Sequence, residues 1–237
     1  MRFRFFTAIL FALLSFAAFG QFDLLSALPD VPEVTPQITP GAWVEYMIKD
    51  NDGNAQKMKF SIISQEKEDD IEYYWFELKT TDQEGKWSIF KFKSTDPKNK
   101  EAAVSLIIQI QGEQPRQMDF MLPSNRPVAK GAETEPVEEI EIPEVEIDVK
   151  KDVTIEVAAG KFKCDKYTIT DEEGKTEIWI SPEIPIAGVV RAIREGEGLT
   201  ELTKYGEKGA KSEVSGATQS IELPKLPDLK RLLKKPE

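Results

Sequence analysis

The feature that most constrains this chain is a series of short segments, from residue 42 to residue 205, in which apolar and polar residues alternate. A period of two places successive side chains on opposite faces of a β-strand. The segments are separated by turns rich in Asp, Asn and Gly, such as Asp50–Asn54, Asp82–Gly85 and Asp171–Gly174. We therefore expect an all-β, mainly antiparallel chain with few short helices. The expected strands cover residues 42–48, 58–62, 71–80, 87–94, 103–111, 118–122, 153–157, 162–170, 176–181, 188–193 and 199–205.

Several of these strands are apolar on both faces. In residues 71–78 (IEYYWFEL), Tyr73 and Trp75 point to one side, and Tyr74 and Phe76 to the other. An antiparallel sheet with one face in water should instead alternate between apolar and polar residues. Because few helices are available to cover the second face, we expect a curved sheet or half-barrel with an apolar interior.

The N-terminus has the pattern of a secretory signal. Arg2 and Arg4 precede an uncharged, mostly apolar run over 5–18, and small residues at Ala18 and Gly20 predict cleavage before Gln21. We expect residues 1–20 to be a signal peptide and the mature chain to be periplasmic or otherwise extracytoplasmic. An uncleaved N-terminal membrane anchor is the alternative. No Cys follows the apolar run, so a lipid anchor on an N-terminal Cys is excluded.

Composition excludes several classes of function. The chain contains no His, which rules out Ser-His-Asp catalysis and His-held metals, and its single Cys rules out an internal disulfide. Its net charge is −11, and cleavage of the signal takes it to −13 because two arginines are lost. Nucleic-acid binding needs a clustered excess of Lys and Arg, so we expect no nucleic-acid partner. We also expect no enzyme activity, no metal and no cofactor.

Three segments stand outside the expected sheet. Residues 21–40 hold a Pro-rich linker, residues 128–151 an acidic, Pro-broken insertion, and residues 207–237 a C-terminal tail with a short amphipathic piece at 229–235. The half-barrel domain accordingly covers 41–206. Within the insertion, residues 137–149 fit either an irregular edge strand or a mobile acidic flap, because Pro143 argues against a central strand.

Two stretches resemble a known type of bacterial envelope protein. One is Val157–Cys164 (VAAGKFKC), and the other is Glu177–Pro185 (EIWISPEIP) with Gly188-Val189-Val190 after it. The opening Gly41–Tyr46 (GAWVEY) is similar to the first strand of such proteins. The chain thus resembles periplasmic half-barrel proteins of the LolA/LolB-like type. That resemblance implies a non-enzymatic protein whose concave sheet holds acyl chains, although this chain lacks the helices that plug the groove of the carriers.

Candidate binding residues follow from this expectation. Arg191 and Arg194 are candidate headgroup contacts, with a cross-strand ion pair to Glu as the alternative. The aromatics are candidates for an apolar groove, and a closed core is the alternative for each of them. The groove candidates are Trp43, Phe60, Tyr73, Trp75, Trp87, Phe90 and Trp179, with Phe92 beside them.

Two further features bear on partners. Phe162 and Cys164 share one parity and Tyr167 and Ile169 the other, which predicts a bulge near Asp165 and a buried, structural Cys164. The acidic residues 133–148 fit either a surface for a basic partner or a solvated insertion. We expect a monomer.

The sequence as a whole predicts an exported protein that binds a lipid, a lipidated protein or another apolar ligand on the concave face of a β-sheet. The alternative is an envelope structural or protein-interaction module with a filled core.

Overall fold

The structure, a computed structural model, describes residues 38–68, 70–95, 103–119, 146–171 and 174–220. All regular structure in these ranges is β, as predicted, and none of it forms a helix long and apolar enough to cross a membrane. The amphipathic piece at 229–235 lies outside the described residues. The strands are β1 (Trp43–Asp50), β2 (Ala55–Glu68), β3 (Ile71–Thr81), β4 (Trp87–Ser94), β5 (Ala103–Ile110), β6 (Arg116–Asp119), β7 (Glu146–Val157), β8 (Gly160–Asp171), β9 (Gly174–Ile180), β10 (Val189–Arg194), β11 (Gly198–Gly206) and β12 (Gln219–Ser220).

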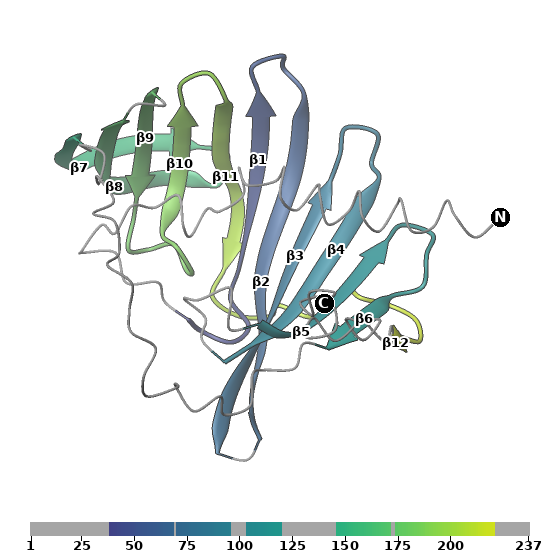
Figure 1. The fold of residues 1–237 in the computed structure, drawn as a ribbon. Helices are drawn as coiled ribbons and strands as arrows, with labels where there is room; N and C mark the ends of the chain where they lie inside the picture. The colour runs from purple at the N-terminus through teal and green to yellow at the C-terminus, as the bar shows by residue number, and fades with distance from the viewer. Residues whose placement is uncertain (1–37, 69, 96–102, 120–145, 172–173, 221–237) are drawn as a thin grey trace, which may run out of the picture.

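The strands form one sheet in the order β12-β6-β5-β4-β3-β2-β1-β11-β10-β9-β8-β7 (Figure 1). Two runs of consecutive antiparallel strands, β1 to β6 and β7 to β11, meet where β1 pairs with β11. The pairing of β12 with β6 is parallel. The end strands β12 and β7 are not neighbours, so the sheet stays open. The predicted curved, mainly antiparallel sheet is therefore confirmed.

Two local predictions need correction or completion. The predicted strands 58–62 and 71–80 leave the charged residues 66–70 as a connection, but β2 continues to Glu68 and β3 begins at Ile71. Cross-strand contacts explain the extension, because Glu66 lies opposite Tyr73 and Lys93 bonds Glu68 at 2.7 Å. In the acidic insertion, residues 146–149 are the start of β7, an edge strand, so the edge-strand interpretation holds there. The earlier part of the insertion, residues 128–145, lies outside the described residues.

The predicted irregularity near Asp165 is confirmed. The register of β7 and β8 shifts between Lys150 and Val153, and the main chain of Asp152 has a φ of +61°. Asp165 holds this bulge by accepting bonds from the Asp152 amide at 3.3 Å and the Lys151 ammonium at 3.0 Å. On either side of it the buried residues of β8 change parity, from Phe162 and Cys164 to Tyr167 and Ile169.

The two faces of β1 to β6 differ in chemistry. We call one the apolar face; cross-strand register places on it, among others, Val44, Tyr46, Met58, Phe60, Phe76, Leu78, Phe90, Phe92, Leu106 and Ile108. We call the other the lysine–tryptophan face, which carries Trp43, Lys59, Tyr73, Trp75, Lys79, Trp87, Lys91 and Lys93. Alternation along each strand produces this division directly.

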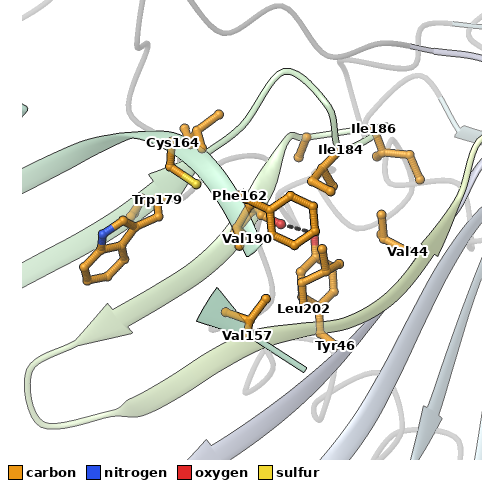
Figure 2. Close-up of a cluster of buried hydrophobic side chains, with 14 of the residues drawn as sticks. Val44, Tyr46, Val157, Phe162, Cys164, Trp179, Ile184, Ile186, Val190 and Leu202 are labelled. Atoms are coloured by element: carbon orange, nitrogen blue, oxygen red, sulfur yellow. Dashed lines mark hydrogen bonds between the residues drawn. The ribbon is translucent and has the colours of Figure 1, made fainter. Parts of the chain in front are cut away.

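Most of the buried core lies at one end of the sheet, which we call the packed end: β1, β7 to β11 and the loop 181–188. The β7–β8 hairpin runs across β9, β10 and β11 (Figure 1), and the Ala159 amide bonds the Leu202 carbonyl at 3.4 Å. Phe162 packs edge-on against Tyr205, with 5.8 Å between ring centroids. Side chains of the hairpin, the loop and the central strands converge there, including Val44, Tyr46, Val157, Phe162, Ile184, Ile186, Val190 and Leu202 (Figure 2).

The remaining strands, β2 to β6, form what we call the open end. Their lysine–tryptophan face is crossed by residues 207–220, the C-terminal strap. The Ala210 amide bonds the Gly41 carbonyl at 2.8 Å, and the strap ends as β12 beside β6. The residue before the strap, Gly206, passes close to the Trp43 ring. A Cβ at this position would lie 2.5 Å from Nε1 of Trp43, so a glycine is required there.

Candidate functional site

The apolar face of the open end carries a cluster of stacked aromatic rings. Phe76 lies 5.8 Å from Phe60, 5.1 Å from Phe92 and 6.3 Å from Tyr74 between ring centroids, and each of these pairs is stacked. Such pairs stabilise a structure beyond the area that they bury. Phe76 is only 2 % exposed, whereas its aromatic neighbours are half-buried.

Aliphatic side chains extend this surface across the strands. One cross-strand row runs from Phe60 through Leu78 and Phe90 to Ile108, and the next row contains Ile62, Phe76, Phe92, Leu106 and Met118. Neighbouring strands are about 4.8 Å apart, so β2 to β6 span roughly 19 Å. In the first row, all four side chains are half-buried. The open end thus offers an apolar strip that runs perpendicular to its strands.

The lysine–tryptophan face has a different construction. The four Trp of the chain each carry a cation within 6.0 Å of the ring centroid, and so does Tyr73. Lys91 lies 4.8 Å from Trp75, for example, and Lys93 lies 4.3 Å from Tyr73. A cation over an aromatic ring contributes about 0.5–1 kcal/mol at an exposed site. Each of these rings therefore forms a cation–π interaction with a charged side chain.

The C-terminal strap closes part of this face with polar contacts. Glu77, 2 % exposed, accepts a hydrogen bond from the Ser212 hydroxyl at 2.6 Å and one from the Glu213 amide at 2.8 Å. Gln109 holds both backbone groups of Ser215, each at 2.9 Å. Since every described buried side-chain polar atom has a partner, the strap satisfies groups that its removal would leave unpaired.

Glu213 anchors the same strap between two lysines. Its carboxylate oxygens lie 2.6 Å from the ammonium groups of Lys59 and Lys79. Burial alone would raise the pKa of Glu213, but hydrogen bonds and charge from the two lysines outweigh burial and lower the pKa below its ordinary value. The ionised form is therefore the one that the folded chain favours.

The structure does not bring the predicted groove candidates together. Phe60 and Phe90 lie on the apolar face, together with Phe92. The other five are the four Trp and Tyr73. Trp43, Tyr73, Trp75 and Trp87 lie on the lysine–tryptophan face. Trp179 belongs to the cross-strand row that runs through Arg191, Glu201 and Met47 to Lys57 on the same side.

The two arginine candidates make ion pairs. Arg191 lies opposite Glu201 in the ladder, bonds its carboxylate at 2.6 Å and also bonds the Glu156 carbonyl at 3.2 Å. This is the cross-strand ion pair that was the alternative to a headgroup contact. Arg194 lies 3.4 Å from Glu197.

A surface hollow lies beside the tips of the β1–β2, β3–β4 and β10–β11 hairpins. Apolar residues in its lining include Ile48, Ile178, Val189 and Ala192, and charged residues of both signs occur in the turns around them, among them Asp50, Lys86, Arg194 and Glu197. Arg194 therefore borders a hollow with an apolar component, whereas Arg191 is not part of its lining. The Asp50 carboxylate stabilises its own turn, because it accepts hydrogen bonds from the backbone amide and the side-chain amide of Asn54, each at 2.8 Å.

Tyr46 and Cys164 are among the buried titratable side chains of the packed end. The Tyr46 hydroxyl donates to the Val189 carbonyl at 3.0 Å (Figure 2), and burial raises its pKa well above the ordinary value. Burial, with smaller contributions from Glu183 and Asp165, raises the pKa of the Cys164 thiol to about 11. The thiolate is the reactive form of Cys, so Cys164 is suited to packing.

Within the described ranges, no three or more Cys, Asp or Glu side chains are placed to hold a metal ion together.

The groove candidates chosen from the sequence leave out three residues that make the apolar strip continuous. Leu78, Leu106 and Ile108 join Phe60, Phe90 and Phe92 there. The signal was present as parity along residues 71–78 and 103–110. It needed the register between strands to become a surface, and register is not visible within one strand.

Comparison with known proteins gave only distant likenesses. No family profile matches the chain, and no curated protein matches it. Two solved structures are similar over 73 % of this chain and 98 % of theirs. One is a proposed lipoprotein from Parabacteroides distasonis, with 13 % identity and a TM-score of 0.33. The other, a proposed exported protein with a YmcC-like fold from Bacteroides fragilis, has 12 % identity and a TM-score of 0.34.

Proposed function

We propose that the chain is an exported, non-enzymatic protein that binds an acyl chain on the apolar face of its open end. The observation that carries this proposal is the half-buried strip from Phe60 through Leu78 and Phe90 to Ile108, on a sheet whose opposite face is crossed by the strap. The sequence resemblance to LolA/LolB-like half-barrels supports the same class of ligand. Export is supported by the signal peptide predicted at residues 1–20.

Burial of methylene groups supplies the affinity in this proposal. Each buried methylene contributes about 0.8 kcal/mol, and the strip from Phe60 to Ile108 spans roughly 14 Å across β2 to β5, long enough for many of them to lie across the strands. The aromatic neighbours of Phe76 offer flat, rigid contact surfaces to the acyl chain of the ligand. The mechanism is passive: the ligand is held by burial and leaves when the apolar contacts separate.

The hollow at the hairpin tips supplies a polar end for such a ligand. Its lining combines apolar residues with charges of both signs. Lys86 and Arg194 are the cations suited to an anionic headgroup, which would compete with their ion pairs to Glu84 and Glu197. We assign the headgroup role to this region, with Arg194 as the candidate, because Arg194 borders the hollow and Arg191 is not part of its lining.

A second candidate function has its own observation. The packed end is a filled core in which Tyr46, Val190 and Leu202 are at most 1 % exposed. A structural or interaction module needs such a core and no ligand. The two functions differ in what the open end does.

Binding of a dansyl-labelled undecanoic acid, followed by its fluorescence, tests the proposal. We expect saturable binding by the exported protein and a loss of at least tenfold in affinity for Leu78→Glu and Phe90→Glu, because each buries a charge in the strip. Thr81→Glu on the opposite face of the same strand is the matched control and should bind as the unmodified protein does. Equal binding by all variants would overturn the assignment of the site. Absence of binding by the unmodified protein would favour the filled-core module.

A further inference from the structure

Strand β7 is the outer strand of the packed end and offers an unusually exposed edge. In the described sheet β8 is its one neighbour, and residues 146–152 are all exposed. Ile147 is 44 % exposed and Val149 39 % exposed, although both are large and apolar. Natural sheets usually protect such an edge, because its unpaired backbone groups are a template for another strand.

Two charges on this edge make no ion pair with any residue that the structure describes. Asp148 lies opposite Thr168, and Lys150 lies opposite another lysine, Lys166. Lys166 is already bonded to Glu177 at 2.8 Å. In the described part of the chain neither Asp148 nor Lys150 makes an ion pair. The edge therefore presents an unmatched acid and an unmatched base, one residue apart on either side of Val149.

We propose that β7 is a homodimer interface, in which two copies pair antiparallel about a two-fold axis at Val149. In this register Asp148 of each copy lies opposite Lys150 of the other, so two ion pairs form by symmetry. Val149 meets Val149 of the second copy on the other face, beside Tyr167. The sheet continues from one copy into the next, and the unpaired backbone groups of both edges are satisfied.

The register follows from alternation and charge. An axis perpendicular to the sheet keeps like faces together, so the residues that face each other must have the same parity. Centring the pair on Asp148 would place that carboxylate opposite its own copy, and like charges directly opposite each other are destabilising. Centring it on Val149 removes this repulsion and converts both unmatched charges into pairs. The bulge at Lys151 and Asp152 ends the regular part of the interface.

A second copy fits this edge better than an unrelated strand does, because the charges of residues 148–150 are complementary to the same residues in reverse order. The sequence alone gives no sign of oligomerisation, and the expectation from it was a monomer. The inference is independent of acyl binding, since the open end lies at the opposite side of the sheet.

Charge reversal tests the pairing. We expect the exported protein to sediment as a concentration-dependent dimer, and Asp148→Lys or Lys150→Asp to weaken the dimer about tenfold or more, because each makes both pairs repulsive. The double variant D148K/K150D restores the pairs in reversed order and should restore the dimer. Lys57→Asp, at an exposed lysine on β2, is the control. A monomeric unmodified protein, or a dimer that tolerates either single reversal, would overturn the proposal.

Cross-linking tests the register separately. Val149→Cys places two thiols directly opposite each other at a spacing that a disulfide can bridge, so mild oxidation should give a covalent dimer. Ile147→Cys lies on the same face, but its two copies are about 13 Å apart along the strands and should not cross-link. Cys164 is buried and does not compete. Equal cross-linking of both variants, or of neither, would contradict the register.

Discussion

The packed end and the open end are built from the same kind of alternating sequence, yet they bury it differently. At the packed end the β7–β8 hairpin and the loop 181–188 cover the central strands, and Tyr46, Val190 and Leu202 are at most 1 % exposed. At the open end Phe60, Leu78 and Phe90 are half-buried. Alternation therefore determines which side chains share a face, whereas covering segments from elsewhere in the chain determine whether that face becomes a core.

The second face shows the same contrast. Around Trp179 the cover consists of charged side chains of the sheet itself, with Lys166 4.7 Å from the ring centroid. At the open end a separate segment, the C-terminal strap, is held by Glu77 and Gln109. Stability at the packed end should therefore depend on apolar packing. At the open end it should depend more on polar contacts with the strap.

The largest expected difference between the two ends comes from a pair of leucine truncations. Leu202→Ala should lower the free energy of unfolding by about 2–5 kcal/mol, because a cavity forms where neighbours cannot collapse. Leu78→Ala should cost roughly 1–2 kcal/mol, since its side chain is half-buried. Urea unfolding of both variants measures the difference. Equal losses would show that the open end is packed as tightly as the packed end.

A smaller effect is expected from loosening the strap. Glu77→Ala leaves the Ser212 hydroxyl and the Glu213 amide without their acceptor, which should cost about 1–3 kcal/mol. Hydrogen exchange should become faster at the amides of Glu213 and Ser215. Glu72→Ala, at an exposed position of the same strand, is the control and should change neither quantity. Unchanged exchange in Glu77→Ala would mean that other contacts hold the strap.

The smallest effect is expected from acid. The pKa of Glu213 is lower in the folded chain than its ordinary value of 4.5, so its ion pairs with Lys59 and Lys79 contribute stability above that value. This contribution should be lost as the pH falls below about 4.5 toward the folded pKa. Urea unfolding of Glu213→Gln and the unmodified protein, measured from pH 6 to about pH 3, should converge at low pH. A constant difference across that range would contradict the role of the ionised carboxylate.

Much of the fold follows from the sequence because strand formation and turns are local. The turns at Asp50–Asn54 and Asp82–Gly85 and the bulge at Asp165 were all readable from a few neighbouring residues. The pairing of β1 with β11 was not, because it joins segments far apart in the chain. The strap contacts of residues 212–215 could not be predicted for the same reason, since Glu77 and Gln109 form their hydrogen bonds with residues more than 100 positions away in the sequence.

The sequence predicted that the candidate site is an apolar surface, but not which residues belong to it. Aromatic residues on both parities indicated an apolar surface, and Phe60 and Phe90 lie on it. The four Trp do not, because cross-strand register places them on the opposite face. There each ring has a lysine ammonium within 5.5 Å of its centroid. Neither parity nor residue type within one strand reveals such a partner on the next.

The claim on which the proposed function depends can be tested by native mass spectrometry of the exported protein, purified without detergent. The claim is that the open end holds an acyl chain on the strip from Phe60 to Ile108. The predicted result is a stoichiometric lipid adduct, recovered as an acyl-containing species in the organic extract and lost in Leu78→Glu but retained in Thr81→Glu. A bare polypeptide mass in repeated preparations, with no acyl species in the extract, would contradict the claim.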